Sequence, residues 1–390
     1  MRVTICCKRF GPRGGAEAFL INFARHLVRK GHQVRALAQQ TDGGIAGVEV
    51  MRLSVPPVPR AFQDLALARA AQKALTAEVT DVTFSDQRCL GAQVVRLGGG
   101  VQREFVRQRR KSYRNPLGRA VNDILRWASI RERLRLSIEG RMYRHPALRR
   151  VIANSDMVRR EVEEHFPRVA GRVRVVYNGA DPERFSPELK RKHRAAVREE
   201  FRIPPDALVG VFVGHDWRRK GLFTYLRALG LLARKPTPRP VCALVVGRGN
   251  TRRARAFAGR QGIAELVRFT GDHLPDAFYG ASDLLVLPSY YDPCANVTME
   301  ALACGLPVVT SAHNGAYELL TPGENGFYVE DASDANGLAE FIEHFLDEER
   351  LRTASEAARG LALQYTLSGQ YAKILEVLQE AAEEIRKPHE

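Results

Sequence analysis

Long apolar runs are missing from this sequence of 390 residues. Arg or Gly interrupts its longest apolar stretches within about ten residues, whereas a membrane-spanning helix needs roughly 18 to 20 apolar residues in succession. The N-terminal apolar run ends at Lys8-Arg9 and is too short for the core of a signal peptide. These absences predict a chain that does not cross a bilayer and that begins with a β-strand.

Cysteine motifs are also missing. The six cysteines include no C-x-x-C pair, and none has a histidine at zinc spacing, so we expect neither a disulfide framework nor a metal site. A reducing cytoplasm is the simplest compartment for such a chain. With 45% hydrophobic and 27% charged residues, the chain is too apolar to be disordered, and its length corresponds to two ordinary domains.

Acidic residues are scarce in one part of the chain. The segment from Arg96 to Arg160 has 18 Lys and Arg but 5 Asp and Glu, a net charge of +13, against +16 for the whole chain. Apolar residues recur in it at helical spacing with arginines between them: Trp127, Ile130, Leu134, Ile138 and Met142. This spacing predicts one amphipathic basic helix.

Such a helix is suited to an anionic membrane surface or a polyanionic acceptor. The alternative is a helix that packs on its own domain and has a solvated basic face. Nucleic-acid binding needs the same positive charge, but the sequence has no helix-turn-helix, zinc-finger or aromatic RNA-binding motif, so we expect no nucleic-acid partner.

Strand-like and helical segments alternate along the chain, which is typical of parallel α/β sheets. Strand-like runs lie first at 3–7, 33–37, 48–53, 82–84, 151–154 and 173–177, and a helical stripe at 16–30. A linker rich in turn residues follows from Asn178 to Pro187, and further runs lie at 208–213, 241–246, 267–270, 284–287, 307–310 and 326–329. We therefore predict a domain over 1–180 with a basic insert at about 96–145, a domain over 181–363, and a helix over 364–390 that packs back on the body.

Glycines and cations follow several of the predicted strands. Gly14 and Gly15 open a helix, where free backbone N–H groups favour an anion, although a plain tight turn has the same sequence. Arg219 and Lys220 offer cations for a diphosphate, with a solvated loop as the alternative. Gly247 follows the next strand, where a flat base can lie against the backbone.

The stretch 285–309 carries the most complete pattern. Asp292 lies in a loop after a strand, and Glu300 lies one turn inside a helix that begins near Asn296. Carboxylates accept hydrogen bonds from sugar or ribose hydroxyls, while a helix N-terminus attracts phosphate. Together these are the complementary halves of a nucleotide-sugar site.

On these motifs the chain resembles the retaining GT-B glycosyltransferases of family 4 over nearly all of its length. The resemblance rests on Gly14-Gly15, Asn178-Gly179-Ala180-Asp181, the Gly214 to Gly221 loop, and Asp292-x7-Glu300 followed by Ala301 to Val309. The Gly-His-Asp-Trp before the cation pair and the long basic insert are similar to lipopolysaccharide core glucosyltransferases. The resemblance implies two Rossmann-like parallel-sheet domains facing a central cleft. It also implies transfer of glucose from UDP-glucose to a glycolipid such as the lipopolysaccharide inner core, at the cytoplasmic face of the membrane.

The resemblance implies roles for the site residues. Arg219 and Lys220 would hold the donor diphosphate, Asp292 the hydroxyls of the transferred sugar, and Glu300 the ribose hydroxyls. The N–H groups of Asn296 and Val297 would bind phosphate, and Gly14 and Gly15 would close the site from the first domain. Because the cations neutralise the leaving group and no D-x-D cluster is present, we expect no metal and no cofactor.

Two departures from the family's motifs concern the sugar and the acceptor. Asp292 stands where Glu is usual, and Gly98 to Gln102 replaces a Gly-Asp-Gly-x-His pattern. In the retaining mechanism the leaving diphosphate accepts the proton of the acceptor hydroxyl, so Gln102 in place of His is compatible with transfer. The alternatives are a nucleotide-sugar epimerase on the same architecture, and a protein that has lost transfer and binds an anionic membrane or polyanion.

Overall fold

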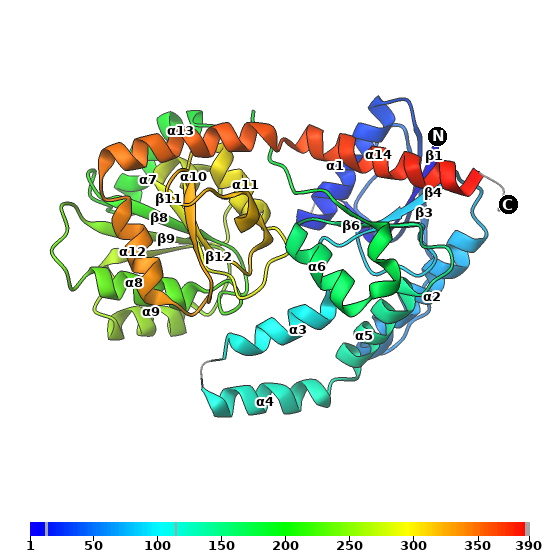
Figure 1. Ribbon diagram of the computed structural model, residues 1–390, viewed down its shortest axis with the longest axis horizontal. Helices are drawn as coiled ribbons and strands as arrows, with labels where there is room; N and C mark the ends of the chain where they lie inside the picture. Colours follow the sequence, from blue (N-terminus) through cyan, green and yellow to red (C-terminus); the bar gives the residue numbers. More distant parts are fainter. Residues whose placement is uncertain (12–14, 114, 387–390) are drawn as a thin grey trace. The chain divides into compact units, whose positions relative to one another are not determined.

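The computed structural model describes residues 1–11, 15–113 and 115–386, and the chain divides into two compact units. Unit 1 comprises Met1–Tyr177 and Ser368–Glu390, and unit 2 comprises Asn178–Leu367. The chain crosses between them after Tyr177 and after Leu367, where we expected boundaries at 180 and 363. Each unit is a parallel sheet with helices on its faces, which confirms the α/β prediction (Figure 1).

Unit 1 contains a seven-stranded parallel sheet with the order β3-β2-β1-β4-β5-β6-β7. The strands are β1 (Arg2–Phe10), β2 (Gln33–Thr41), β3 (Val48–Arg52), β4 (Val82–Ser85), β5 (Val94–Arg96), β6 (Arg150–Ala153) and β7 (Val173–Val175). Sequence reasoning missed β5, because three residues are too few to show a period. The order reverses between β1 and β4, as in doubly wound sheets.

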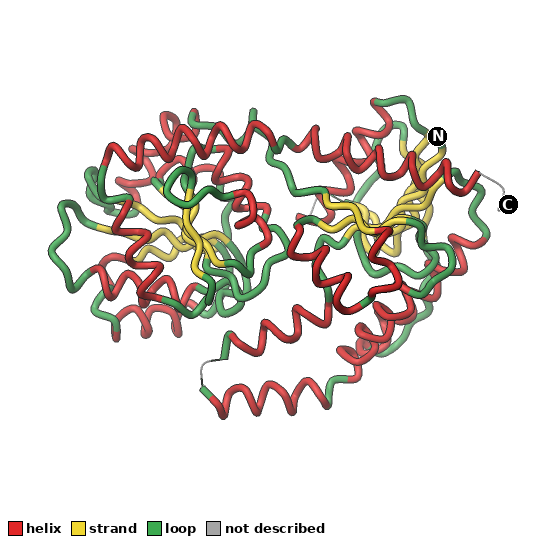
Figure 2. The backbone as a smooth tube through the Cα atoms, in the orientation of Figure 1, coloured by secondary structure: helices red, strands yellow, loops and turns green. Residues whose placement is uncertain are grey.

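The helices of unit 1 are α1 (Gly15–Arg29), α2 (Gln63–Thr76), α3 (Gln102–Lys111), α4 (Pro116–Trp127), α5 (Ile130–Tyr143), α6 (Asp156–His165) and the C-terminal α14 (Leu367–Arg386). In Figure 2 α14 runs alongside the sheet of this unit. Its Tyr371 ring packs against Phe19 and Phe23 of α1, with centroids 5.6 Å apart in both pairs. No helix among the described residues is both long enough and apolar enough to span a membrane.

The prediction of one basic helix through Trp127 and Met142 is wrong, because α4 ends at Trp127 and α5 begins at Ile130. The side chain of Ser129 accepts a hydrogen bond from the backbone N–H of Glu132 and so caps a new helix. A spacing of three between Trp127 and Ile130 fits a continuous helix, and the cap that interrupts it has no effect on apolar periodicity.

Two of the arginines of α5 are paired with an acid of the same unit. Arg131 and Arg135 both pair with Asp64 of α2, at 3.1 and 2.6 Å. On the same helix Ile138 and Met142 are buried. Helix α5 therefore packs on its own unit, which is the alternative stated for the basic stripe.

Unit 2 contains a six-stranded parallel sheet with the order β10-β9-β8-β11-β12-β13. The strands are β8 (Leu208–Val213), β9 (Val241–Val246), β10 (Val267–Gly271), β11 (Leu284–Leu287), β12 (Val308–Ser311) and β13 (Gly326–Val329). The helices are α7 (Glu188–Glu200), α8 (Leu222–Leu232), α9 (Thr251–Arg260), α10 (Asp276–Ala281), α11 (Asn296–Ala303), α12 (Ala335–His344) and α13 (Glu348–Gln364).

The central strands of unit 2 are covered on both faces. Every residue of β8, β9 and β11 is buried, which explains their nearly continuous apolar sequences. The chain passes from β8 through β9 to β10 on one side and then returns to β11 on the other side of β8. The carboxyl ends of β8 and β11 therefore meet at the switch point, where doubly wound sheets bind ligands.

Candidate functional site

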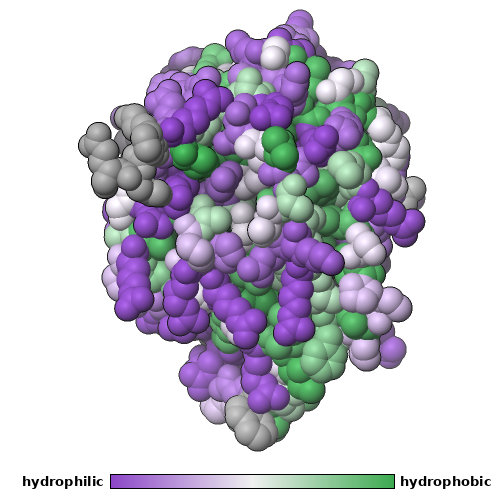
Figure 3. Space-filling view, turned by 90° about the vertical axis from the view of Figure 1, so that its right-hand side faces the viewer, coloured by the Kyte–Doolittle hydropathy of each residue, from purple (hydrophilic) through white to green (hydrophobic). Residues whose placement is uncertain are grey.

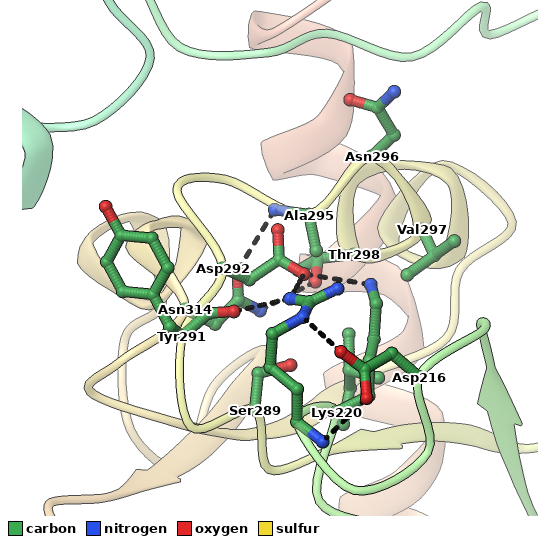
Figure 4. A network of polar contacts seen from close by, with 12 residues as sticks. Asp216, Lys220, Ser289, Tyr291, Asp292, Ala295, Asn296, Val297, Thr298 and Asn314 are labelled. Carbon is green, nitrogen blue, oxygen red and sulfur yellow. Dashed lines mark hydrogen bonds and ion pairs between the residues drawn. The ribbon is translucent and has the colours of Figure 1, made fainter. Parts of the chain in front are cut away.

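The predicted donor residues of unit 2 gather at this switch point. Lys220 belongs to the loop after β8, and Asp292 to the loop between β11 and α11. Figure 4 shows the two side chains pointing toward one another, with the first turn of α11 beside them. A separation of 72 positions in sequence becomes a direct contact because β8 and β11 are neighbours in the sheet.

Glycines set the path of the loop that carries Lys220. Gly221 has φ +82°, and a Cβ at this position would overlap the carbonyl oxygen of Pro288. A Cβ at Gly247 would overlap the carbonyl oxygen of Gly214, so the loops after β8 and β9 touch through their backbones. Gly247 therefore has a packing role in addition to its predicted contact with a base.

Asp292 lies at the centre of the site. Its side chain is buried, and Oδ2 is 2.8 Å from Lys220 Nζ and 3.5 Å from Arg219 Nη1. Burial by itself raises the pKa of this carboxyl, but the two cations outweigh burial and hold the pKa of Asp292 below its ordinary value. The carboxylate is therefore ionised at neutral pH.

Arg219 braces two loops as well as supplying charge. Its Nε is 3.2 Å from Asp216 Oδ2, and its Nη1 donates a hydrogen bond of 2.6 Å to the carbonyl oxygen of Tyr291. Asp216 has φ +50°, a left-handed conformation that is uncommon for a residue other than glycine and that recurs at functional sites. The loop geometry therefore holds the guanidinium beside Lys220.

Two asparagines that sequence reasoning did not assign to the site hold the start of α11. Asn314 Oδ1 accepts a hydrogen bond of 3.1 Å from the N–H of Ala295. Asn178 Nδ2 donates hydrogen bonds of 2.7 Å to the carbonyl oxygen of Cys294 and to Asn296 Oδ1. The sequence around Asn178 predicts a linker, and the spacing around Asn314 carries no signal for a site.

The first turn of α11 remains open to a ligand. Its N-cap is Ala295, which has no side-chain oxygen to occupy the N–H groups of the first turn. In Figure 4 the side chain of Asn296 lies apart from the Asp292 contacts, so this residue would offer its backbone N–H rather than its side chain to the site. These N–H groups and the helix dipole favour a phosphate.

Glu300 lies one turn inside α11, on the same side as the hydroxyl of Tyr279. Tyr279 donates a hydrogen bond of 2.8 Å to Glu300 Oε2. Burial raises the pKa of Glu300 above its ordinary value, and the Tyr279 hydrogen bond and the cations Arg184 and Lys220 oppose this shift. The remaining carboxylate oxygen can accept a hydrogen bond from a ligand hydroxyl.

The structure does not test the glycine pair of the first domain as a part of this site. Gly14 lies outside the described residues, and Gly15 is the first residue of α1 in unit 1. Within the described ranges, no group of three or more His, Cys, Asp or Glu side chains is arranged to hold a metal ion.

Both units match models of known protein families. Residues 13–184 match the family described as "Glycosyltransferase Family 4", and residues 207–348 match "Glycosyl transferases group 1". One match thus covers most of the N-terminal part of the chain and the other most of unit 2, and the two parallel-sheet units have the GT-B fold.

Relatives and solved structures agree with this assignment. The chain is 34% identical to "D-inositol 3-phosphate glycosyltransferase 2" of Catenulispora acidiphila over 61% of its own length and 57% of the relative's. It is 33% identical to "D-inositol 3-phosphate glycosyltransferase" of Streptomyces avermitilis over 56% of its own length and 49% of the relative's. The chain therefore spans about half the length of these relatives.

Among solved structures, WaaG, "a glycosyltransferase involved in lipopolysaccharide biosynthesis", has a TM-score of 0.77 at 22% identity, covering 96% of this chain and 99% of WaaG. Anabaena Alr3699/HepE in complex with UDP-glucose has a TM-score of 0.70 at 22% identity, covering 97% of this chain and 100% of that one. At these identities the likeness concerns the fold.

Proposed function

We propose that this chain is a retaining, metal-independent glycosyltransferase that moves glucose from UDP-glucose to a glycolipid acceptor. The observation that carries the proposal is the buried contact of 2.8 Å between Lys220 and Asp292, beside the open first turn of α11. It combines a cation for a diphosphate, a carboxylate for sugar hydroxyls and N–H groups for phosphate within one site. The family matches support glycosyl transfer, and the UDP-glucose complex of the neighbour of similar fold supports the choice of donor.

The proposed reaction breaks the bond between the anomeric carbon and the diphosphate oxygen and forms a bond from that carbon to the acceptor oxygen on the same face. The proton of the acceptor hydroxyl passes to the departing diphosphate. Lys220 and Arg219 would stabilise the negative charge that develops on the diphosphate, and this role replaces a metal ion. Asp292 would orient the sugar, and Glu300 the ribose.

Thermal unfolding with added nucleotides tests the donor. We expect UDP and UDP-glucose to raise the Tm by a few degrees, with or without EDTA, because a ligand at about 100 times its Kd stabilises the folded state by about 2.7 kcal/mol. GDP, GDP-mannose and UDP-N-acetylglucosamine serve as comparisons. A shift that EDTA removes would contradict metal independence, and no shift with any uridine nucleotide would reject the proposed donor.

The names of the relatives point to a second candidate for the acceptor. Both matched relatives are called D-inositol 3-phosphate glycosyltransferases, so a small inositol phosphate is the other candidate for this chain. Transfer of labelled glucose to lipopolysaccharide inner core in micelles, compared with transfer to inositol 3-phosphate, separates the two. The glycolipid is preferred here because of the exposed surface of α4.

Helix α4 presents an apolar row to the outside of unit 1. Leu117, Ile124 and Leu125 are 66 to 70% exposed, and Val121 is 47% exposed. These positions follow the spacing of one helix face. Figure 3 shows hydrophobic side chains gathered toward the lower end of the face it draws, below long hydrophilic ones.

Exposed cations surround this row. The exposed cations of this part of unit 1 include Arg103, Arg107 and Lys111 on α3, Arg119 on α4, Arg133 and Arg141 on α5, and Arg144 directly after α5. An apolar helix face flanked by arginines is suited to the interface of an anionic bilayer. We therefore propose that α4, rather than the stripe from Trp127 to Met142, attaches the protein to the cytoplasmic face of a membrane.

Vesicle binding checks this attachment. We expect co-sedimentation with vesicles containing phosphatidylglycerol, and a steep loss of binding as salt is added, because exposed charges are screened within about 10 Å at 0.1 M salt. Replacing Leu117, Ile124 and Leu125 with serine is expected to weaken binding by more than about tenfold, since burial of each of these aliphatic side chains contributes on the order of 1.5 kcal/mol. Leu363→Ser, on α13 of unit 2 at 50% exposure, is the matched control. Vesicle binding that changes neither with salt concentration nor with the serine substitutions in α4 would reject the membrane role.

A further inference from the structure

The hydroxyl of a buried tyrosine faces the carboxylate that the donor site needs. Tyr279, on α10, is 1% exposed, and its hydroxyl oxygen is 2.8 Å from Glu300 Oε2 and 3.4 Å from the carbonyl oxygen of Val297. Its ring packs edge-on against Phe185, with centroids 6.0 Å apart. The ring cannot turn away without disturbing this packing, so the hydroxyl has a defined position.

We propose that Tyr279 is a positioning residue that holds the Glu300 carboxylate in the orientation that accepts the ribose hydroxyls of the donor. The inference rests on the proposed function, because it assumes that Glu300 binds the donor. It extends the site to α10, which carries none of the residues assigned to donor binding. One carboxylate oxygen is held by the tyrosine, and the other is left to the ribose.

The charges around Glu300 make this hydrogen bond important. Arg184 and Lys220 lower the pKa of Glu300, Asp276 raises it, and burial raises it most. Because Arg184 is itself paired with Asp276, at 2.8 Å, its positive charge acts on both carboxylates and not on Glu300 alone.

Two weak acids beside this carboxylate, the Cys304 thiol and the Tyr279 hydroxyl, stay neutral. Burial, followed by the charge of Glu300, raises the pKa of the Cys304 thiol to about 12 and that of the Tyr279 hydroxyl well above its ordinary value. Both groups are therefore protonated at neutral pH. The Tyr279 hydroxyl therefore acts as a donor, and its hydrogen bond of 2.8 Å goes to the Glu300 carboxylate.

Removal of the hydroxyl in Tyr279→Phe has a pH-dependent consequence. A hydrogen bond to an ionised group is stronger than one to a neutral group and corresponds to a factor of about ten or more in an equilibrium constant. Its loss raises the pKa of Glu300 further, so Glu300 becomes protonated at a higher pH. The affinity for UDP-glucose therefore begins to fall at a higher pH in the variant than in the wild type.

The first measurement is UDP-glucose binding by calorimetry at a series of pH values from mildly acidic to mildly alkaline. UDP-glucose is the probe because its diphosphate diester has no proton that titrates in this range. We expect the Kd of Tyr279→Phe to exceed that of the wild type by about tenfold on the acidic side. As the pH rises the difference should shrink to a smaller, constant factor, which reports the lost orientation of the ionised carboxylate. In a Glu300→Gln background, Tyr279→Phe is expected to add no pH-dependent change.

The second measurement needs no ligand. Because the lost hydrogen bond is stronger to the ionised carboxylate, the stability lost in Tyr279→Phe should increase as the pH rises through the pKa of Glu300. Tyr225→Phe is the matched control. Tyr225 is fully buried, and its hydroxyl donates a hydrogen bond of 3.0 Å to the carbonyl oxygen of Gly210. This variant therefore also loses a buried hydrogen bond, but one that involves no carboxylate. Its loss of stability should not depend on pH in this range.

The outcomes separate the inference from the proposed function. A stability loss in Tyr279→Phe that is as independent of pH as that in Tyr225→Phe overturns the inference, whatever the donor. A pH-dependent stability loss with an unshifted binding profile also overturns it, because the contact then does not serve the donor. A wild type that binds no UDP-glucose, while the two residues remain coupled in stability, rejects the proposed donor and with it the role of Tyr279 toward ribose.

Discussion

Lys220→Ala is expected to lower the rate of glycosyl transfer by about 10²- to 10³-fold, because removal of a single group that stabilises developing negative charge costs about this much in other enzymes. The structure adds a second reason. Lys220 Nζ is the closest cation to the buried carboxylate of Asp292, at 2.8 Å. Without it, that carboxylate keeps a longer contact of 3.5 Å with Arg219. Steady-state transfer of labelled glucose measures the effect.

Lys220→Ala is also expected to change the stability of the folded protein. Asp292 has a folded-state pKa below its ordinary value, so its contribution to stability is present above the ordinary pKa and is lost as the pH falls through the lowered one. Lys220→Ala should reduce this contribution at neutral pH. Lys235→Ala, which removes an exposed partner of Glu343, is the control and should leave both transfer and Tm unchanged. A Lys220→Ala enzyme with near-normal transfer would show that the diphosphate site has been misplaced.

Gly221→Ala is expected to destabilise unit 2 by about 3 kcal/mol and to abolish UDP-glucose binding. A left-handed residue other than glycine costs about 1–2 kcal/mol, and Gly221 has φ +82°. In addition, the new Cβ would overlap the backbone carbonyl oxygen of Pro288, which belongs to the segment that follows β11 and cannot move independently of it. Relief of the overlap requires the loop that carries Lys220 to move relative to the segment that leads to Asp292, which disturbs the contact between the two side chains.

Denaturant unfolding together with UDP-glucose binding checks this expectation. Gly360→Ala is the matched control, because Gly360 lies inside α13 with nothing within 4 Å of an added Cβ. Alanine is the better helix former there by up to about 1 kcal/mol, so this variant should be equally or more stable than the wild type. Normal stability and normal donor affinity in Gly221→Ala would mean that the backbone at Gly221 does not have the left-handed conformation and the close approach to Pro288 described above.

Local sequence was sufficient where neighbouring residues act together. The strands β8, β9 and β11 were predicted at their observed bounds, because parallel strands buried on both faces are nearly continuous apolar runs. The sequence places Asp292 in a loop and Glu300 one turn inside a helix. The step of eight positions between them covers the end of that loop and the first turn of α11, which begins at Asn296. These features depend on contacts within a few residues.

The errors arose where a distant residue or a single cap decides the structure. Apolar periodicity continues from Trp127 to Met142, yet the hydrogen bond from Glu132 N–H to Ser129 begins a new helix. The arginines of the stripe appeared to form an exposed basic face, but Asp64, 67 and 71 positions earlier in the chain, pairs with two of them. The exposed apolar row on α4 was not recognised, because its exposure depends on which face of the helix packs on the rest of unit 1.

The sequence by itself determined the two parallel α/β units, the loops that carry Lys220 and Asp292, and the helix that carries Glu300. Only the tertiary structure decided that Lys220 contacts Asp292, that Asn178 and Asn314 hold the start of α11, and that Tyr279 faces Glu300. The physical reason is the range of the interactions. Apolar periodicity, glycine conformation and helix starts follow from adjacent residues, whereas the pairing of buried charges and hydroxyls depends on which strands are neighbours at the switch point of the sheet.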